Sequence, residues 1–214
     1  MSAKALIFDF NGTLSDDEPI LCEIFIQLFA EHGKPLSAQE YFDHLAGHSD
    51  PEIVYRWLGR DHPDVEAVID ERVRRYRDAV SDGSSISPAA REAVRYAAER
   101  VPVAIVSGAA RAEIVPVIEA AGIAPLFTAV VTSDDVGDRG KPDPEGYLQA
   151  LAALDGVAAI EVVAFEDTEA GVTSAKAAGM RVIARLGTLV PDRLAAAEEL
   201  IDTIDVELVR RLIG

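Results

Sequence analysis

Ala5-Leu6-Ile7-Phe8-Asp9-Phe10-Asn11-Gly12-Thr13-Leu14 starts as an apolar run and then brings a carboxylate, an amide, a glycine and a hydroxyl close together. Continuous apolar runs of this length are typical of strands that are buried on both faces of a parallel sheet. In open α/β sheets, ligands bind at the carboxyl ends of such strands. We therefore expect a strand over residues 5–10 and a loop after it that carries reactive groups.

Four further apolar runs repeat this pattern. Each of them follows a segment with helical periodicity, and they cover residues 101–107, 127–132, 162–165 and 180–186. Helices are predicted over 88–99, 110–121, 144–154 and 168–178, with Ser87 as the N-cap of the first. Regular alternation of strands and helices predicts an α/β fold with a Rossmann-like parallel sheet.

Residues 16–84 interrupt the alternation. They contain at least three helical patterns, over about 18–32, 38–45 and 63–81, and no convincing strand. A connection of that length in a compact sheet indicates an inserted subdomain. We predict an α-helical cap over 16–84 and an α/β core over 1–15 and 85–214, whose last residues carry two weaker helical patterns.

Charge and composition exclude several classes of protein. The 214 residues carry a net charge of −17, which argues against nucleic-acid binding because that needs clustered Lys and Arg. The sequence shows no apolar run long enough for a membrane span, and Met1 leads almost directly into the first strand, so we expect a cytoplasmic protein. Its oligomeric state is expected to be a monomer or a homodimer. Cys22 is the only cysteine; it lies in an apolar helical pattern and is expected to be a buried structural thiol.

Acidic and hydroxyl side chains follow the predicted strands at the same edge of the sheet. These residues are Asp9, Ser107, Asp134, Asp135, Glu166 and Asp167. Hard oxygen ligands beside a carboxylate nucleophile are what Mg²⁺-assisted phosphoryl transfer requires. The sequence therefore predicts a ligand site at this edge.

Four motifs make this expectation specific. They are Asp9 to Thr13, Ser107-Gly108, Lys141 before Pro-Asp-Pro, and Glu166-Asp167, in this order along the chain. The set resembles the motifs of haloacid dehalogenase-like hydrolases, in particular the phosphatases and β-phosphoglucomutase-like proteins with a helical cap. That resemblance implies an aspartyl-phosphate mechanism with Mg²⁺ as the cofactor.

The resemblance also implies roles for individual residues. Asp9 would be the nucleophile and Lys141 would hold the phosphoryl group, while Thr13, Ser107 and Gly108 would orient the loop and contact the phosphoryl oxygens. The metal ligands would be Asp9, the backbone carbonyl of Asn11, Asp167, and Glu166 directly or through water. Asp167 could instead cap the helix predicted over 168–178.

Asn11 departs from the family pattern, which has a second Asp at this position. In the family phosphatases that Asp protonates the leaving oxygen and then activates water. An amide has no titratable proton in the useful range, and such catalysis typically contributes about 10² to 10⁴-fold. We expect turnover of ordinary phosphate esters to fall by something of that order.

Three explanations of Asn11 stay open. The substrate could have a leaving group that needs little protonation, another group such as His48, Asp16 or Asp17 could replace the missing acid, or the chain could bind a phosphorylated ligand with little turnover. Gly47, His48 and Ser49 resemble the substrate-specificity loop of β-phosphoglucomutase-like caps. The basic residues of the mutase form are Ala46 and Asp50 here, which disfavours a mutase.

The sequence as a whole favours a Mg²⁺-dependent phosphatase of a small phosphorylated metabolite. The alternatives are a phospholigand-binding protein with little or no turnover, and a C–P or C–halogen hydrolase of the same superfamily. C–P hydrolysis would need a cap lysine, and Lys34 is the only one. The basic run over 72–77 is expected to be a solvated helix face that could attract anions.

Overall fold

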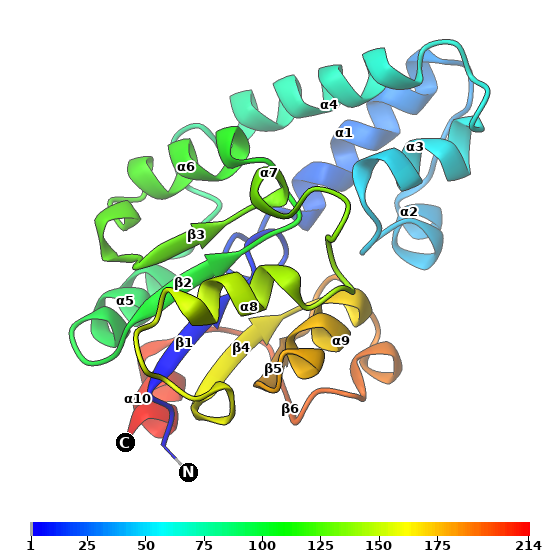
Figure 1. The fold of residues 1–214 in the computed structure, drawn as a ribbon. Coiled ribbons are helices and arrows are strands. Elements are labelled where there is room, and N and C mark those ends of the chain that lie inside the picture. Colours follow the sequence, from blue (N-terminus) through cyan, green and yellow to red (C-terminus); the bar gives the residue numbers. More distant parts are fainter. Residues whose placement is uncertain (1) are drawn as a thin grey trace.

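The computed structural model describes residues 2–214. Six parallel strands form one sheet in the order β3-β2-β1-β4-β5-β6 (Figure 1). The residues of β1, β2 and β4 are buried, as their apolar composition requires. The strands are β1 Ala5–Phe8, β2 Val103–Val106, β3 Ala129–Val131, β4 Val162–Glu166, β5 Arg181–Arg185 and β6 Glu199–Ile201.

Helices cover both faces of the sheet. Helices α8 and α9 pack together on the face that is in front in Figure 1, and α5 and α10 pack against each other on the opposite face. The first six helices are α1 Glu18–Glu31, α2 Ala38–His44, α3 Asp50–Leu58, α4 Val65–Val80, α5 Pro88–Ala98 and α6 Arg111–Ala120. The others are α7 Ser133–Val136, α8 Glu145–Ala152, α9 Glu169–Ala177 and α10 Val206–Ile213.

The Rossmann-like α/β prediction is confirmed, with three omissions. Strand β6 was not predicted, because its three residues lie at the sheet edge and carry Glu199 in place of an apolar run. Helices α3 and α7 were not predicted either; α3 begins directly after the segment interpreted as a specificity loop, and α7 is a single turn of four residues. The side chain of Ser87 accepts a hydrogen bond from the Ala90 amide, as expected of an N-cap.

Residues 16–84, the predicted cap, contain α1 to α4 and no strand. We call this segment the helical insertion. Helix α1 packs along α4, and Phe25, Phe29 and Tyr41 form a small aromatic core between its helices. Cys22 is buried in the same region, and burial raises the pKa of its thiol to about 11, so the inert form dominates.

Two connecting segments join the insertion to the sheet, and they lie side by side. The Asp16 amide donates to the Ser85 carbonyl over 2.8 Å, and the Ser15 hydroxyl donates to the Ser85 hydroxyl over the same distance. The insertion therefore stands above the carboxyl ends of the strands (Figure 1). In the described part of the chain, every helix is too short or too polar to cross a membrane.

Candidate active site

Asp9 is the first residue after β1, and the sheet itself positions it. Its backbone amide donates to the Phe165 carbonyl over 2.9 Å, which extends the pairing of β1 with β4. The carboxylate is almost completely buried and lies on the wall of a cavity at the sheet edge. It is thus a fixed carboxylate facing an open space.

A group of three buried carboxylates surrounds this point. Asp9, Glu166 and Asp167 each offer an oxygen, and these oxygens lie within 4.8 Å of one another. Burial raises the pKa of Asp9 to about 7, although Lys141 lowers it, and burial raises the pKa of Asp167 well above its ordinary range. Three carboxylates beside one lysine leave an excess of negative charge, and all the atoms that could bind a metal ion are oxygens. The group fits a hard divalent cation.

Lys141 is the one cation in direct contact with these acids within residues 2–214. Its ammonium group donates to Asp9 over 2.5 Å, to Glu166, and to the Val106 carbonyl over 3.2 Å. Burial disfavours its charge, but the two carboxylates outweigh burial, so the pKa of Lys141 is raised. A permanently charged lysine at this position can neutralise an incoming anion.

Glu166 and Asp167 occupy different positions. Asp167 lies on the cavity wall, whereas Glu166 lies behind it and accepts hydrogen bonds from Lys141 and from Tyr147 over 2.6 Å. A Cβ atom at Gly171 would lie 1.9 Å from a Glu166 oxygen, so the first turn of α9 needs glycine there. Thr168 caps that helix, and Asp167 does not. Asp167 is therefore available to a ligand.

The loop after β1 is held against Asp167. The hydroxyls of Thr13 and Thr188 both donate to its carboxylate, with Thr13 at 3.0 Å. Gly12 has φ +70°, and a Cβ there would lie 2.0 Å from an Asp167 oxygen, so only glycine fits. Thr13 is not one of the residues on the cavity wall, and its contact with Asp167 gives it an orienting position.

Asn11 lies on the cavity wall, and its amide group is turned to a buried network. Its Nδ2 donates to Asp17 over 3.0 Å and to the Tyr76 hydroxyl over 2.9 Å. Tyr76 belongs to α4 and also donates to Asp17 over 2.5 Å, while the Gly12 amide binds the second oxygen of Asp17. Burial raises the pKa of Asp17. The side chain of Asn11 is thus tied to both the loop and the insertion.

Ser107 and Gly108 follow β2 and lie on the cavity wall. The Ser107 amide continues the pairing with β3 by donating to the Val131 carbonyl over 2.9 Å. Its side-chain oxygen accepts from the Ala109 amide over 3.1 Å. A Cβ on Gly108 would meet nothing within 4 Å, so the space beside this backbone is open to a ligand.

The cavity has a volume of about 690 Å³ and is walled on one side by the sheet edge and on the other by the insertion. Gly47, His48 and Ser49, the residues predicted to form a specificity loop, all lie on its wall. Burial, followed by the nearby Arg56, lowers the pKa of His48. The cavity can hold a molecule of the size of a small metabolite.

Seven charged residues of the cavity wall were not predicted as site residues, and four of them, Glu18, Asp50, Arg72 and Glu113, lie on helices. Arg72 is 4% exposed; it pairs with Asp50 over 3.2 Å and with Glu113 of α6, and its Nε has no hydrogen-bond partner among the described residues. Glu18 accepts from the Tyr41 hydroxyl over 2.9 Å, and burial raises its pKa to about 7. The solvated face expected for the basic run is therefore wrong at Arg72.

Other candidate residues lie elsewhere. Asp134 and Asp135 do not join the acidic group; they accept hydrogen bonds from the backbone amide and the side chain of Arg111, respectively. Asp16 pairs with Arg185 over 2.9 Å. Lys34 donates to backbone carbonyls of the α3 end and is not on the cavity wall. Of the groups that could replace the acid at position 11, only His48 was both predicted and found on the wall.

Comparison with known proteins agrees with this geometry. Residues 6–185 match the family model of the haloacid dehalogenase-like hydrolases. A validoxylamine A 7'-phosphate phosphatase of Streptomyces hygroscopicus subsp. limoneus is 30% identical over 92% of both chains. A phosphorylated carbohydrates phosphatase of Thermotoga maritima is also 30% identical, over 84% of this chain and 83% of the relative.

A solved structure matches the whole fold. It is that of a mutant of CbbY from Rhodobacter sphaeroides in complex with xylulose-1,5-bisphosphate. The identity is 26%, the TM-score is 0.79, and the match covers 97% of this chain and 96% of the other. The likeness therefore extends over both the sheet and the insertion.

Proposed function

The chain belongs to the haloacid dehalogenase-like hydrolase family, and we propose that it is a phosphatase that hydrolyses a small phosphate monoester at Asp9. The observation that carries the proposal is the contact of Lys141 with Asp9 and Glu166 on a metabolite-sized cavity. A fixed nucleophile, a fixed cation and an open space occur together there. The relatives named as phosphatases support the same reaction.

We propose Mg²⁺ as the cofactor. Asp9, Asp167 and the backbone carbonyl of Asn11 would hold it, with Glu166 binding directly or through water. When bound, it would supply positive charge for the phosphoryl oxygens and so lower the repulsion between substrate and carboxylate. The buried acids that the lysine leaves uncompensated are the structural support for this choice.

The reaction uses groups that Asn11 leaves unchanged. The Asp9 carboxylate attacks phosphorus, and the bond from phosphorus to the leaving oxygen breaks, which gives an aspartyl-phosphate and an alkoxide. Lys141 and Ser107 hold the phosphoryl oxygens during this transfer. Water then attacks the same phosphorus, the bond to Asp9 breaks, and inorganic phosphate leaves.

Proton transfer is the weak part of this site. The leaving alkoxide needs a proton, and the attacking water must lose one. Asn11 can do neither, and Asp17 lies behind it in full burial. His48 and Glu18 lie on the wall; burial lowers the pKa of His48 and raises the pKa of Glu18 to about 7, and we propose these two groups as partial substitutes.

The charges of the cavity indicate the substrate class. Where the insertion meets α6, Glu18, Asp50 and Glu113 surround the single cation Arg72. The other arginine of the wall within residues 2–214, Arg139, is paired with Glu145 over 2.7 Å. A second phosphate would meet excess negative charge here. We propose a monophosphate whose remainder is neutral and rich in hydroxyls, or carries an amine.

A specific observation also supports a second function, the binding of a phosphorylated ligand with little turnover. The aspartate-to-asparagine mutant of CbbY is known in complex with a sugar bisphosphate, and this chain carries asparagine in its own nucleophile loop. A protein that binds a phosphorylated ligand and turns it over very slowly would have such a site. The acidic pair Glu166 and Asp167 and the remote position of Lys34 favour both of these functions over C–halogen or C–P hydrolysis.

Time courses with an activated aryl phosphate distinguish the two. We expect steady Mg²⁺-dependent release of phosphate over many turnovers, because a phenolate of low pKa leaves without a proton. The Asp9→Asn variant is the matched control and should release none. The measurement is phosphate released per chain against time, with and without EDTA.

Each other outcome has a defined meaning. Release of one phosphate per chain followed by arrest would replace the phosphatase with a trap for a phosphorylated ligand. The absence of any release, or equal release by the Asp9→Asn variant, would contradict the proposed reaction at Asp9.

A further inference from the structure

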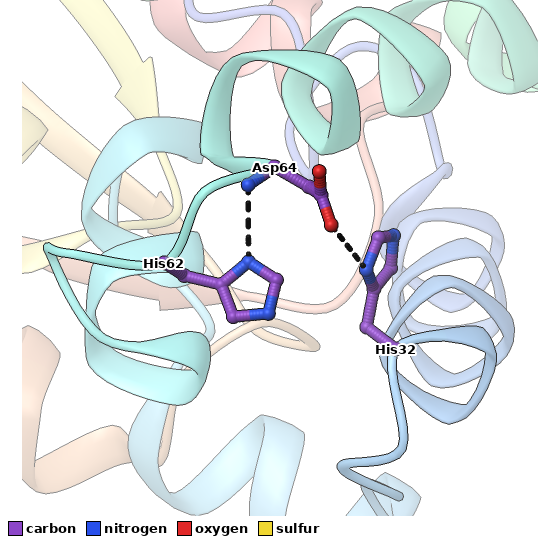
Figure 2. Close-up of side chains that lie close together, drawn as sticks. All are labelled: His32, His62 and Asp64. Carbon is purple, nitrogen blue, oxygen red and sulfur yellow. Dashed lines mark hydrogen bonds and ion pairs between the residues drawn. The ribbon is translucent and has the colours of Figure 1, made fainter.

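A second cluster of side chains that could hold a metal ion lies at the far end of the insertion. His32 follows the end of α1, His62 lies in the loop before α4, and Asp64 precedes the first residue of α4 (Figure 2). One ligand atom from each of the three lies within 4.8 Å of the others. None of them lies on the cavity wall described above. The cluster is therefore separate from the carboxylates at Asp9.

The side chains of the cluster face one another. His32 Nδ1 is 3.6 Å from an Asp64 oxygen, and the rings of His32 and His62 meet edge to face with centroids 5.5 Å apart (Figure 2). The Asp64 amide donates to His62 Nδ1 over 3.3 Å, a long bond that a small rotation of the ring can exchange for another partner. All three groups are at least partly open to solvent.

Next to the cluster, other residues fix the end of α1 to the end of α3. The Lys34 ammonium donates to the carbonyls of Trp57 and Leu58 over 3.2 Å each. In return, the Trp57 indole donates to the Lys34 carbonyl over 2.9 Å, and its ring stacks on Phe29 of α1. The end of α1 and the end of α3 are thus held together without any help from the histidines.

The ligand set selects one class of ion. Two imidazoles and one carboxylate suit zinc and its neighbours among the transition metals, whereas Mg²⁺ and Ca²⁺ prefer oxygen alone. Nitrogen and oxygen ligands at about 2.0–2.2 Å around a tetrahedral ion lie roughly 3.3–3.6 Å apart. The 3.6 Å between His32 and Asp64 already matches that separation.

We propose that His32, His62 and Asp64 form a Zn²⁺-class site that links the end of α1 to the start of α4. A solvent molecule completes the coordination. The site joins the two longest helices of the insertion at the end opposite to its connections with the sheet. A bound ion therefore rigidifies the insertion without contacting the phosphoryl site.

The single tryptophan of the chain makes the site measurable. Trp57 is hydrogen-bonded to Lys34, two residues beyond His32. Paramagnetic Co²⁺ or Cu²⁺ in the cluster should quench its fluorescence, and EDTA should restore it. The chain of 214 residues, freed of metal with EDTA, is titrated with Co²⁺ by fluorescence and with Zn²⁺ by calorimetry, in millimolar Mg²⁺ so that the carboxylates at Asp9 are occupied.

Variants assign the signal. We expect one Zn²⁺ per chain, quenching of Trp57, and a melting temperature that rises with Zn²⁺ concentration. His32→Asn and His62→Asn should each weaken binding by about tenfold or more. Asp64→Asn removes the third proposed ligand and is an independent check of the site. It should keep the fold, since the Asp64 side chain makes no helix-capping hydrogen bond.

His44→Asn is the matched control, because His44 lies at the end of α2 and outside the cluster. It should bind as the wild type does, and so should Asp9→Asn. Equal Zn²⁺ binding by wild type, His32→Asn and His62→Asn would overturn the proposal. So would the absence of stoichiometric binding in Mg²⁺, or loss of binding in Asp9→Asn alone.

Discussion

The side-chain amide of Asn11 is the group on which proton transfer at the proposed active site depends. Both of its hydrogens are donated behind the cavity, to Asp17 and Tyr76. A carboxyl introduced by Asn11→Asp would lie beside the buried carboxyl of Asp17. Two acids in such contact share a proton, so the new group would be protonated near neutral pH, as a general acid must be. The surroundings of position 11 are thus suited to a general acid, which this sequence lacks there.

Glu18 gives a prediction for stability against pH. Burial raises its pKa from 4.5 to about 7 in the folded chain. Its stabilising contribution is therefore complete below pH 4.5 and is lost as pH rises through 7, and it amounts to about 3 kcal/mol. We expect the free energy of unfolding of Glu18→Gln to fall less than that of the wild type over this range.

Urea denaturation at pH 4.5 and pH 7.5 measures this difference. Glu23→Gln is the control, because Glu23 lies on the exposed side of the same helix and its only described contact is with Gln27. A pH dependence that is unchanged in Glu18→Gln would show that Glu18 titrates as an ordinary surface glutamate.

How far single residues could be predicted depends on where they lie. Asp9, Ser107 and Asp167 follow apolar strands, so both position and proximity were predictable, and the motif around Lys141 identified the fourth group. Glu18, Asp50, Arg72 and Glu113 reach the cavity from four different helices. Their meeting depends on how the insertion packs against α6, for which the local sequence carries no signal.

Helix α4 shows the same limit at the scale of the element. Its helical periodicity was clear, and its bounds of Val65–Val80 lie close to the prediction. Which face is buried was not clear, because a run of arginines reads as a solvated surface. Tyr76 and Arg72 in fact point into the molecule, where one contacts Asn11 and the other pairs with Glu113. Tertiary pairing here outweighs the pattern of charge.

The first residue of α3 sets the charge of the cavity. Asp50 pairs with Arg72 and adds a negative charge on the side of the insertion. Removing that charge in Asp50→Asn should favour substrates that carry a second anionic group. We expect their KM to fall by about tenfold, while the KM of a monophosphate with a neutral remainder changes little.

Steady-state kinetics with one substrate of each kind checks this prediction. Asp43→Asn is the control, since Asp43 is an exposed acid on α2 that contacts Gln39. Equal changes of KM for both substrates would mean that Asp50 affects folding of the loop and does not select the substrate by charge.

At the scale of the whole molecule, the site is made by two parts of the chain that meet across a cavity. The α/β core supplies Asp9, the proposed nucleophile, together with Lys141, Glu113 and the acidic pair, and the insertion supplies the loop with His48 and the side chains of Glu18, Asp50 and Arg72. A net charge of −17 repels phosphate esters at long range. Binding therefore depends on the local positive charge of Lys141 and of the proposed cation. The fold was predictable because strand and helix periods are local, whereas the charge of the cavity was not.

The central claim is that Asp9 acts as a nucleophile while Asn11 limits proton transfer. The most direct test measures kcat/KM for phosphate monoesters of increasing leaving-group pKa, from aryl to alkyl, in wild type and Asn11→Asp with Mg²⁺. We predict that Asn11→Asp raises the rate for alkyl esters by about 10² to 10⁴-fold and leaves activated aryl esters within about tenfold. The same effect on both kinds of ester, or no gain for either, would contradict the account.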